Sequence, residues 1–97
     1  MFATLQKNIT TAGTPEQLSA VSVPIVSGLP TVIKAKQANT GSITIGNSSS
    51  KALNTGTGCF RLTPGQAVSI RISDLNEVWL DTTVNGEGIE GLYEPLI

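Results

Sequence analysis

The chain has 97 residues and a net charge of −1, so it fits one domain and lacks the basic surplus of a nucleic-acid binder. Hydrophobic residues make up 39% and charged residues only 13%, which favours a thin core under a neutral, Ser-, Thr- and Asn-rich surface. No secretory signal or membrane span is visible, so we expect synthesis in the cytosol without a membrane partner. The one cysteine, Cys59, excludes an intramolecular disulfide and predicts a reduced, partly buried thiol.

The N-terminal stretch, residues 1–9, is predicted to be either a first strand or an arm that orders only on a partner. Residues 10–97 are expected to form the β-sandwich domain. They open with a turn-rich connection in which Gly13 permits and Pro15 restricts the backbone. Residues 17–23 then give a second strand candidate. Its possible core residues are Leu18, Ala20 and Val21.

The segment 32–45, VIKAKQANTGSITI, carries the clearest strand signal. Apolar and polar residues alternate on both sides of Asn-Thr-Gly, which is the period of a strand with one buried face. Asn-Thr-Gly is typical of a tight turn, and Gly41 is free to take the positive φ that such a turn often needs. We therefore expect a β-hairpin, which other strands must cover because one hairpin is only marginally stable. Its core-facing residues are expected to be Ile33, Ala35, Ile43 and Ile45.

The segment 46–58, GNSSSKALNTGTG, is polar and without periodicity, so it predicts a surface loop. Within it Ala52 and Leu53 are expected to turn back toward the core. Residues 66–72 then alternate cleanly between apolar and polar side chains and predict another strand. The inward positions of that strand are expected to be Val68, Ile70 and Ile72.

Two more strands are predicted in the C-terminal quarter, at residues 78–82 and 89–95, with an Asn-Gly turn between them. A corner with Ser73 or Asp74 as its cap precedes the first of them. Trp79 falls on the face opposite the core, so it either marks an interface or is covered within the chain, and the sequence leaves both open. The core-facing residues of this strand are expected to be Val78 and Leu80.

About seven short strands at a spacing of roughly 8–12 residues, without a sustained helical period, are typical of an all-β domain. We expect a single-domain antiparallel β-sandwich or flattened barrel.

The sequence offers no catalytic constellation. It has no His, so the commonest general base and metal ligand is missing and Cys59 has no His to activate it. The carboxylates lack calcium-loop spacing, and residues 46–58 lack the Gly-Lys-Ser/Thr ending of a phosphate-binding loop. We predict a protein that is not an enzyme and that has no cofactor and no metal. The acidic residues weighed for these roles are Asp74, Glu77, Asp81, Glu87 and Glu90, the last two being expected as solvated loop charges.

Several short motifs occur in order along residues 9–94. They are TTAGTPEQL at 10–18, NTG at 39–41, GNS at 46–48, LTPGQAV at 62–68, DLNEVWLD at 74–81 and a Gly-x-Gly-Ile turn at 86–89 before a strand with a tyrosine. In this order the chain resembles a group of small virion proteins of tailed bacteriophages. A cysteine often found in that group before the central strand is absent here, so no shared role for Cys59 follows.

The resemblance implies a non-enzymatic virion structural protein, a capsid decoration or cement subunit that stabilises the shell by bridging major capsid proteins. It also implies a homotrimer on the capsid surface, made in the host cytoplasm. The interface candidates are Phe2, Leu5, Trp79 and Tyr93. Two alternatives stay open: a tail, neck or fibre-base component, and a carbohydrate-binding or adhesion module in which Trp79 or Tyr93 stacks on a glycan.

Overall fold

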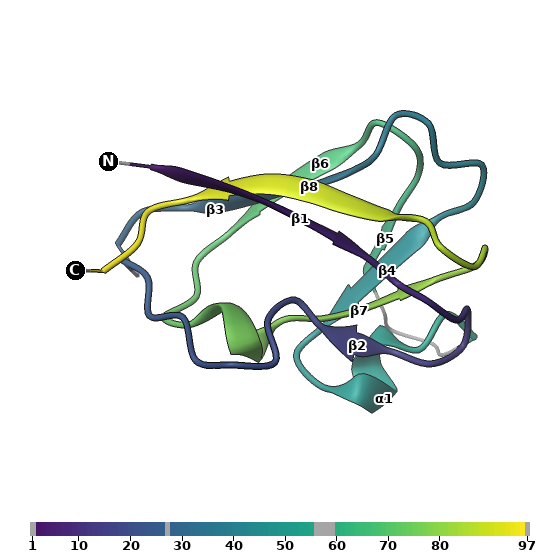
Figure 1. The fold of residues 1–97 in the computed structure, drawn as a ribbon, viewed down its shortest axis with the longest axis horizontal. Helices are drawn as coiled ribbons and strands as arrows, with labels where there is room; N and C mark the ends of the chain where they lie inside the picture. Colours follow the sequence, from purple (N-terminus) through teal and green to yellow (C-terminus); the bar gives the residue numbers. More distant parts are fainter. Residues whose placement is uncertain (1, 27, 56–59, 97) are drawn as a thin grey trace.

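The alternating segments form strands of two antiparallel sheets, which Figure 1 shows in the computed structural model of the chain. The structure describes residues 2–26, 28–55 and 60–96. Within these residues sheet A has the strand order β1 (Ala3–Asn8), β8 (Gly88–Tyr93), β3 (Thr31–Ala35) and β6 (Ala67–Ile70). Sheet B has the order β2 (Glu16–Gln17), β7 (Trp79–Thr82), β4 (Ile43–Gly46) and β5 (Phe60–Leu62). The predicted all-β antiparallel sandwich is confirmed.

The core lies between the two sheets, and burying each large aliphatic side chain there contributes about 1.5–3 kcal/mol. The predicted core residues of the four strands β3, β4, β6 and β7 lie inward as expected. Fully or nearly fully buried are Ile33, Ala35, Ile43, Ile45, Val78 and Leu80. Partly buried and packed against them are Val68, Ile70 and Ile72.

The predicted strand over residues 17–23 is mostly wrong. Leu18 is buried as expected, but β2 ends at Gln17 and the side chains of Ala20 and Val21 are exposed. The Ser19 hydroxyl donates a hydrogen bond to the Val21 carbonyl at 2.7 Å, a local turn that ends the extended chain.

The predicted hairpin over residues 32–45 is wrong, because its two strands belong to different sheets. Strand β3 pairs with β8 and β6, whereas β4 pairs with β7 and β5. Gly41 in the connection is not among the glycines with positive φ. A Cβ at Gly41 would lie 2.1 Å from Thr83 Oγ1, so any larger residue there would have to displace side chains of the connection that packs against it.

Most connections cross from one sheet to the other. Among the strands described, only β4 and β5 are both consecutive in the chain and paired with each other. The Asn-Gly turn between β7 and β8 also joins strands of different sheets, and its Gly86 has a positive φ of 81°. Each crossing leaves backbone N–H groups outside the strand ladders, so these groups need other acceptors.

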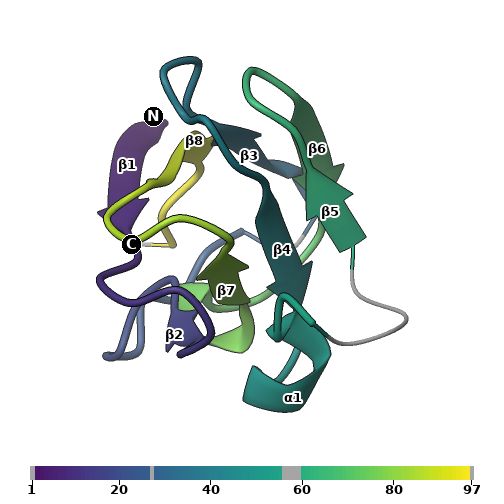
Figure 2. The same ribbon diagram turned by 90° about the vertical axis from the view of Figure 1, so that its right-hand side faces the viewer.

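One helical turn, α1 (Ser49–Ala52), covers part of the outer face of sheet B and lies next to β4 in Figure 2. The segment 46–58 is therefore not simply a loop, although Ala52 is buried as predicted. Thr44 of β4 donates its hydroxyl hydrogen bond to the Ala52 carbonyl. A Cβ at Gly46 would lie 2.5 Å from the Lys51 carbonyl carbon and 2.6 Å from the Ala52 nitrogen. Gly46 thus lets the backbone of α1 lie directly on β4.

The substitution Gly46→Ala is expected to destabilise the fold by about 1–3 kcal/mol, because the added methyl group meets backbone atoms that cannot rotate away. The measurement is urea unfolding followed by tryptophan fluorescence and circular dichroism. Gly28→Ala is the matched control, since a Cβ there meets nothing within 4 Å. Equal unfolding midpoints for the two variants would contradict this role of Gly46.

Candidate functional site

Acidic side chains lie where the chain crosses between the sheets, and each accepts hydrogen bonds from loop N–H groups. Glu87, between β7 and β8, accepts from the Thr40 N–H at 2.7 Å, the Thr40 hydroxyl at 2.9 Å and the Gly41 N–H at 2.9 Å. Thr40 and Gly41 belong to the crossing between β3 and β4. The hydrogen bond from the Gly41 N–H, followed by that from Thr40, lowers the pKa of Glu87 below its ordinary value.

Asp74 plays the same part between β6 and β7. It caps the short 3-10 helix η1 (Leu75–Glu77) by accepting from the Asn76 N–H at 3.0 Å, which confirms Asp74 as one of the two predicted caps. It also accepts from the Val23 N–H at 2.8 Å and from the Ser22 hydroxyl, both in the crossing between β2 and β3. These hydrogen bonds, led by that from Asn76, lower the pKa of Asp74.

Glu77 completes a capping box at the same corner. Its carboxylate accepts from the Ser73 hydroxyl at 2.7 Å, the Ser73 N–H at 2.9 Å and the Asp74 N–H at 2.8 Å. The hydrogen bonds from Ser73, hydroxyl first, lower the pKa of Glu77. The corner before β7 is therefore held by two carboxylates that both act as acceptors.

Asp81 is the acidic side chain in the interior, with no exposed surface. One of its oxygens accepts from the Gly13 N–H at 2.9 Å and the Thr82 N–H at 2.8 Å. The other accepts from the Asn54 N–H at 2.8 Å. A single carboxylate of β7 therefore binds the connection between β1 and β2 and the chain that follows α1.

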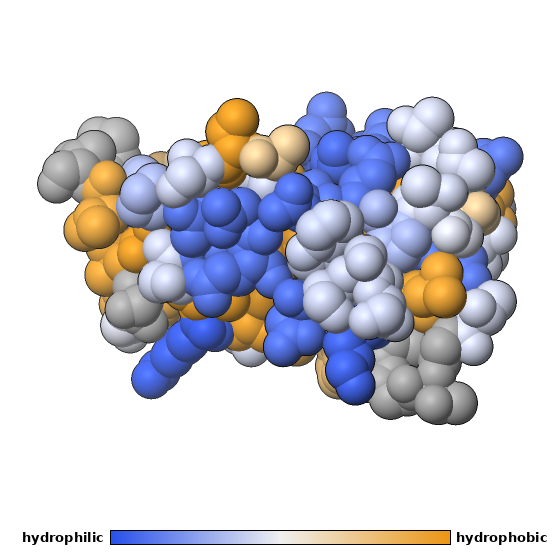
Figure 3. All heavy atoms as spheres, turned by 90° about the horizontal axis from the view of Figure 1, so that it is seen from below, coloured by the Kyte–Doolittle hydropathy of each residue, from blue (hydrophilic) through white to orange (hydrophobic). Residues whose placement is uncertain are grey.

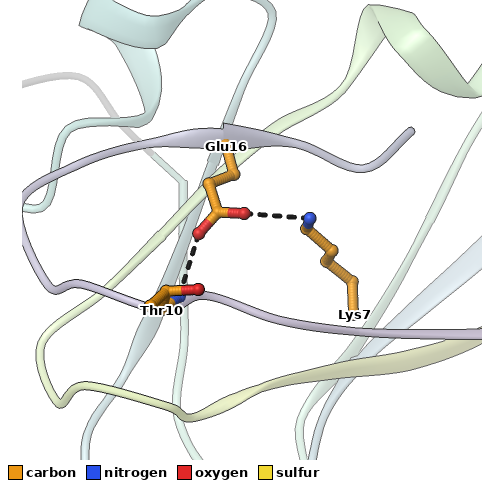
Figure 4. A network of polar contacts seen from close by, with 3 residues as sticks. All are labelled: Lys7, Thr10 and Glu16. Atoms are coloured by element: carbon orange, nitrogen blue, oxygen red, sulfur yellow. Dashed lines mark hydrogen bonds and ion pairs between the residues drawn. The ribbon is translucent and has the colours of Figure 1, made fainter. Parts of the chain in front are cut away.

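Glu16 joins the edges of the two sheets, as Figure 4 shows. Its carboxylate lies 2.9 Å from the Lys7 ammonium and accepts from the Thr10 N–H at 2.9 Å. The hydrogen bond from the Thr10 N–H, followed by that from Lys7, lowers the pKa of Glu16. Since Lys7 lies on β1 and Glu16 on β2, this contact holds an edge strand of sheet A to an edge strand of sheet B.

These carboxylates act as structural acceptors. The prediction of solvated loop charges holds only in part. Glu87 is a partly exposed loop residue, but its carboxylate also accepts from Thr40 and Gly41, and Glu90 is exposed but lies on strand β8, 3.8 Å from Lys34. In the part of the chain that the structure describes, no three Cys, Asp or Glu side chains converge so that they could hold a metal ion. Carboxylates with a lowered pKa stay ionised at neutral pH and accept hydrogen bonds rather than donate protons.

The outer face of sheet A carries a shallow groove of about 560 Å³. The strand register places Thr4, Leu92 and Val32 side by side in one row. It places Gln6, Glu90 and Lys34 in the next outward row. The row between them contains Leu5, Gly91 and Ile33. Leu5 and Ile33 point inward and Gly91 has no side chain, so this row forms the floor of the groove. One wall of the groove is therefore largely apolar, with Leu92 43% exposed, and the other is polar and charged.

A lysine closes the polar end of this face. The Lys36 ammonium donates to the Gln6 and Asn8 side-chain oxygens, at 2.8 Å each. Gly88 lies between β3 and β1 at this level, and its lack of a side chain lets Lys36 reach across β8. The contact ties β3 to β1 over the intervening strand and fixes the side chains beside the groove.

The four interface candidates do not come together. Phe2 is 66% exposed just before β1, whereas Leu5 and Tyr93 are partly buried and packed against the core. Trp79 lies on sheet B, partly exposed, on the outer face that α1 partly covers. The sequence reasoning missed Leu92. Its signal was the adjacent pair of Leu92 and Tyr93, since neighbours in a strand point to opposite faces.

The face of the molecule on the side of β2 and α1 is shown in Figure 3. Hydrophilic side chains occupy most of its centre, and hydrophobic ones gather mainly toward the left end, where Figure 1 places both chain termini. The apolar wall of the groove lies on the opposite sheet.

No known protein family, curated protein or solved structure matches this chain. Among the described residues, no helix has the length and apolar character needed to cross a membrane. The predicted thiol at Cys59 lies outside the described residues.

The substitution Asp81→Asn is expected to destabilise the fold by about 2–3 kcal/mol, because it replaces one acceptor oxygen of a buried carboxyl group by an amide nitrogen that faces a backbone N–H. The measurement is chemical unfolding at neutral pH. Glu90→Gln is the control, because Glu90 is exposed and its one ion pair is long. If Asp81→Asn unfolds at the parent midpoint, Asp81 does not hold the connections that it contacts.

The stability of the fold is expected to decrease as the pH falls below about 4.5, the ordinary value for Glu, and further below 3.8, that of Asp. The folded-state pKa values of Glu16, Asp74, Glu77 and Glu87 are lowered, so the unfolded chain binds protons first. The stabilisation by these four carboxylates is thus complete above their unfolded-state pKa values, and it is lost as the pH falls through their folded-state pKa values. Urea unfolding at a series of pH values from 7 to 3 measures the free energy of unfolding as a function of pH. Glu87→Gln should flatten the profile and Glu90→Gln should not. A profile unchanged in Glu87→Gln would contradict this origin.

Proposed function

We propose that the chain is a non-enzymatic structural subunit of a bacteriophage virion, a decoration or cement protein that stabilises the capsid by bridging major capsid proteins. The order of its sequence motifs, which resembles that of small virion proteins, supports this class of protein. The observation that supports the structural role is that five carboxylates, on the connections or on strands beside them, accept hydrogen bonds from backbone N–H groups and so hold the connections in place. They are Glu16, Asp74, Glu77, Asp81 and Glu87.

The outer face of sheet A is the contact surface in this proposal. Its groove offers Leu92 and Val32 for apolar contacts, and Glu90 and Lys34 for polar contacts at the rim. Such a surface suits another protein, because interfaces combine an apolar centre with a polar rim. Each contact would be weak, but many copies on one closed shell act together by multivalency. A trimer on the capsid surface is part of the proposal and rests on the sequence resemblance.

A carbohydrate-binding role has no comparable support. Stacking on a sugar requires an exposed aromatic face, and neither Trp79 nor Tyr93 lines the groove. Tyr93 packs against the core, and Trp79 lies on the other sheet. A component of the tail, neck or fibre base would bind other virion proteins through the same kind of contact. Only the position of the protein on the particle distinguishes such a component from a capsid decoration subunit.

The test is to add the purified protein to phage particles assembled without it, and to measure co-sedimentation and the temperature at which the particles release DNA. We expect saturable binding to the capsid and a higher release temperature. Leu92→Asp should weaken binding by about tenfold or more, since it places a charge on the apolar wall of the interface.

Val21→Asp is the matched control, because Val21 is 69% exposed and lies outside the groove. It should bind like the parent. Failure of the parent protein to bind any particle would overturn the virion role, and binding at the tail or neck, seen by electron microscopy, would overturn the capsid position. Equal binding by Leu92→Asp and Val21→Asp would exclude the groove as the contact.

A further inference from the structure

Sheet A ends in β1 and β6, and among the described residues each of these strands has one unpaired side. Figure 2 places them on opposite sides of the sandwich. An unpaired strand edge presents a row of N–H and C=O groups that can pair with another strand.

The outward groups of β1 follow from its ladder with β8. The Ile9 N–H donates to the Glu87 carbonyl at 2.9 Å, which continues the register of that ladder. In an antiparallel pair, residues alternate between bonding to the partner strand and pointing away from it. Counting back from Ile9, the backbone groups that point away from β8 are those of Thr4, Gln6 and Asn8.

The outward groups of β6 follow from its ladder with β3. The Ala35 N–H donates to the Gln66 carbonyl at 2.9 Å, next to the registered pair of Lys34 and Ala67. The backbone groups of Ala67 and Ser69 therefore point away from β3. Both edges thus present alternate residues whose side chains lie on the outer face of sheet A.

The two edges are complementary in direction and in side chains. Sheet A is antiparallel throughout its order of β1, β8, β3 and β6, so β1 and β6 run in opposite directions. If residues 5–8 are set against residues 67–70, Leu5 lies opposite Ile70 and Gln6 opposite Ser69. Leu5 and Ile70 are both only partly buried at their own edges, so this pairing would bury more apolar surface on the inner side.

We propose that β1 of one copy of this chain pairs antiparallel with β6 of a second copy, so that sheet A continues from subunit to subunit. The contact joins two different edges, so repeating it around an axis parallel to the strands closes a ring when the rotation per copy divides a full turn. A closed ring leaves neither edge open in any copy. Pairing β1 with β1 would leave β6 open, which proteins avoid because open edges aggregate. The inference stands on the strand edges and does not depend on the proposed function.

The charge on β1 is compatible with this pairing. An inward-pointing lysine on an edge strand can oppose strand addition. Here the Lys7 ammonium is held 2.9 Å from the Glu16 carboxylate of sheet B (Figure 4), so its charge is directed away from the free edge and neutralised.

The first test is cross-linking between single-cysteine variants in a Cys59→Ser background. Gln6→Cys and Ser69→Cys are mixed and treated with a short bismaleimide, since directly opposed residues of an antiparallel pair lie about 5.5 Å apart. We expect cross-linked dimers in the mixture and few with either variant alone. A mixture that cross-links no better than the single variants, or Gln6→Cys that links to itself equally well, would overturn the pairing.

The second test is analytical ultracentrifugation of the full chain over a range of concentrations. We expect concentration-dependent association, weakened about tenfold or more by Gln6→Pro, which removes one outward N–H group from the interface. Gln6→Ala is the matched control because it loses the same side chain and keeps the N–H, so it should associate like the parent. Circular dichroism shows whether each variant is folded, and Ser69→Pro tests the other edge. A parent protein that stays monomeric, or a folded Gln6→Pro that associates normally, would overturn the proposal.

Discussion

The fold depends on carboxylates that accept hydrogen bonds from backbone N–H groups of the crossing connections. A small sandwich in which nearly every described connection changes sheet has many N–H groups outside its ladders, and each costs free energy if it is left without an acceptor. Glu87 and Asp74 each join two separate crossings, and Asp81 joins a connection to the chain after α1. An ionised acceptor makes a stronger hydrogen bond than a neutral one, so a few side chains can fix the loops of a chain with a thin core.

The sequence predicted the strands β3, β4, β6, β7 and β8 because period-two alternation and turn residues are local signals, but it misplaced β2 and did not predict β5. It predicted the inward positions of β3, β4, β6 and β7 for the same reason, and it limited the cap before β7 to Ser73 or Asp74. It did not predict which strands pair, since Asn-Thr-Gly and Asn-Gly are compatible both with a hairpin and with a change of sheet. The sequence also did not predict that Glu87 and Asp81 accept hydrogen bonds from distant connections. Glu87 accepts from Gly41, which lies 46 residues away in the chain, and Asp81 accepts from Gly13, which lies 68 residues away.

Fixing the connections leaves a defined surface for other contacts. The outer face of sheet A has a groove with one apolar wall, and the lysine that crosses over Gly88 holds the side chains at its polar end. In the described part of the chain, the two edge strands of the same sheet, β1 and β6, run in opposite directions and each has one unpaired side. We infer that face and edges have separate uses, the face for a partner protein and the edges for copies of this chain. Both uses require a rigid frame, because an ordered surface loses less conformational entropy on binding.

The most direct measurement of this role of the carboxylates is a pH titration by nuclear magnetic resonance of the side-chain carboxyl carbons together with the backbone N–H signals. We expect Glu87 to titrate below the ordinary Glu value of 4.5, with the Thr40 and Gly41 N–H signals moving at the same midpoint. We expect Asp74 to titrate below 3.8, with the Val23 and Asn76 N–H signals following it. Midpoints at the ordinary values, with N–H signals that do not follow their carboxylates, would contradict the central role of these hydrogen bonds.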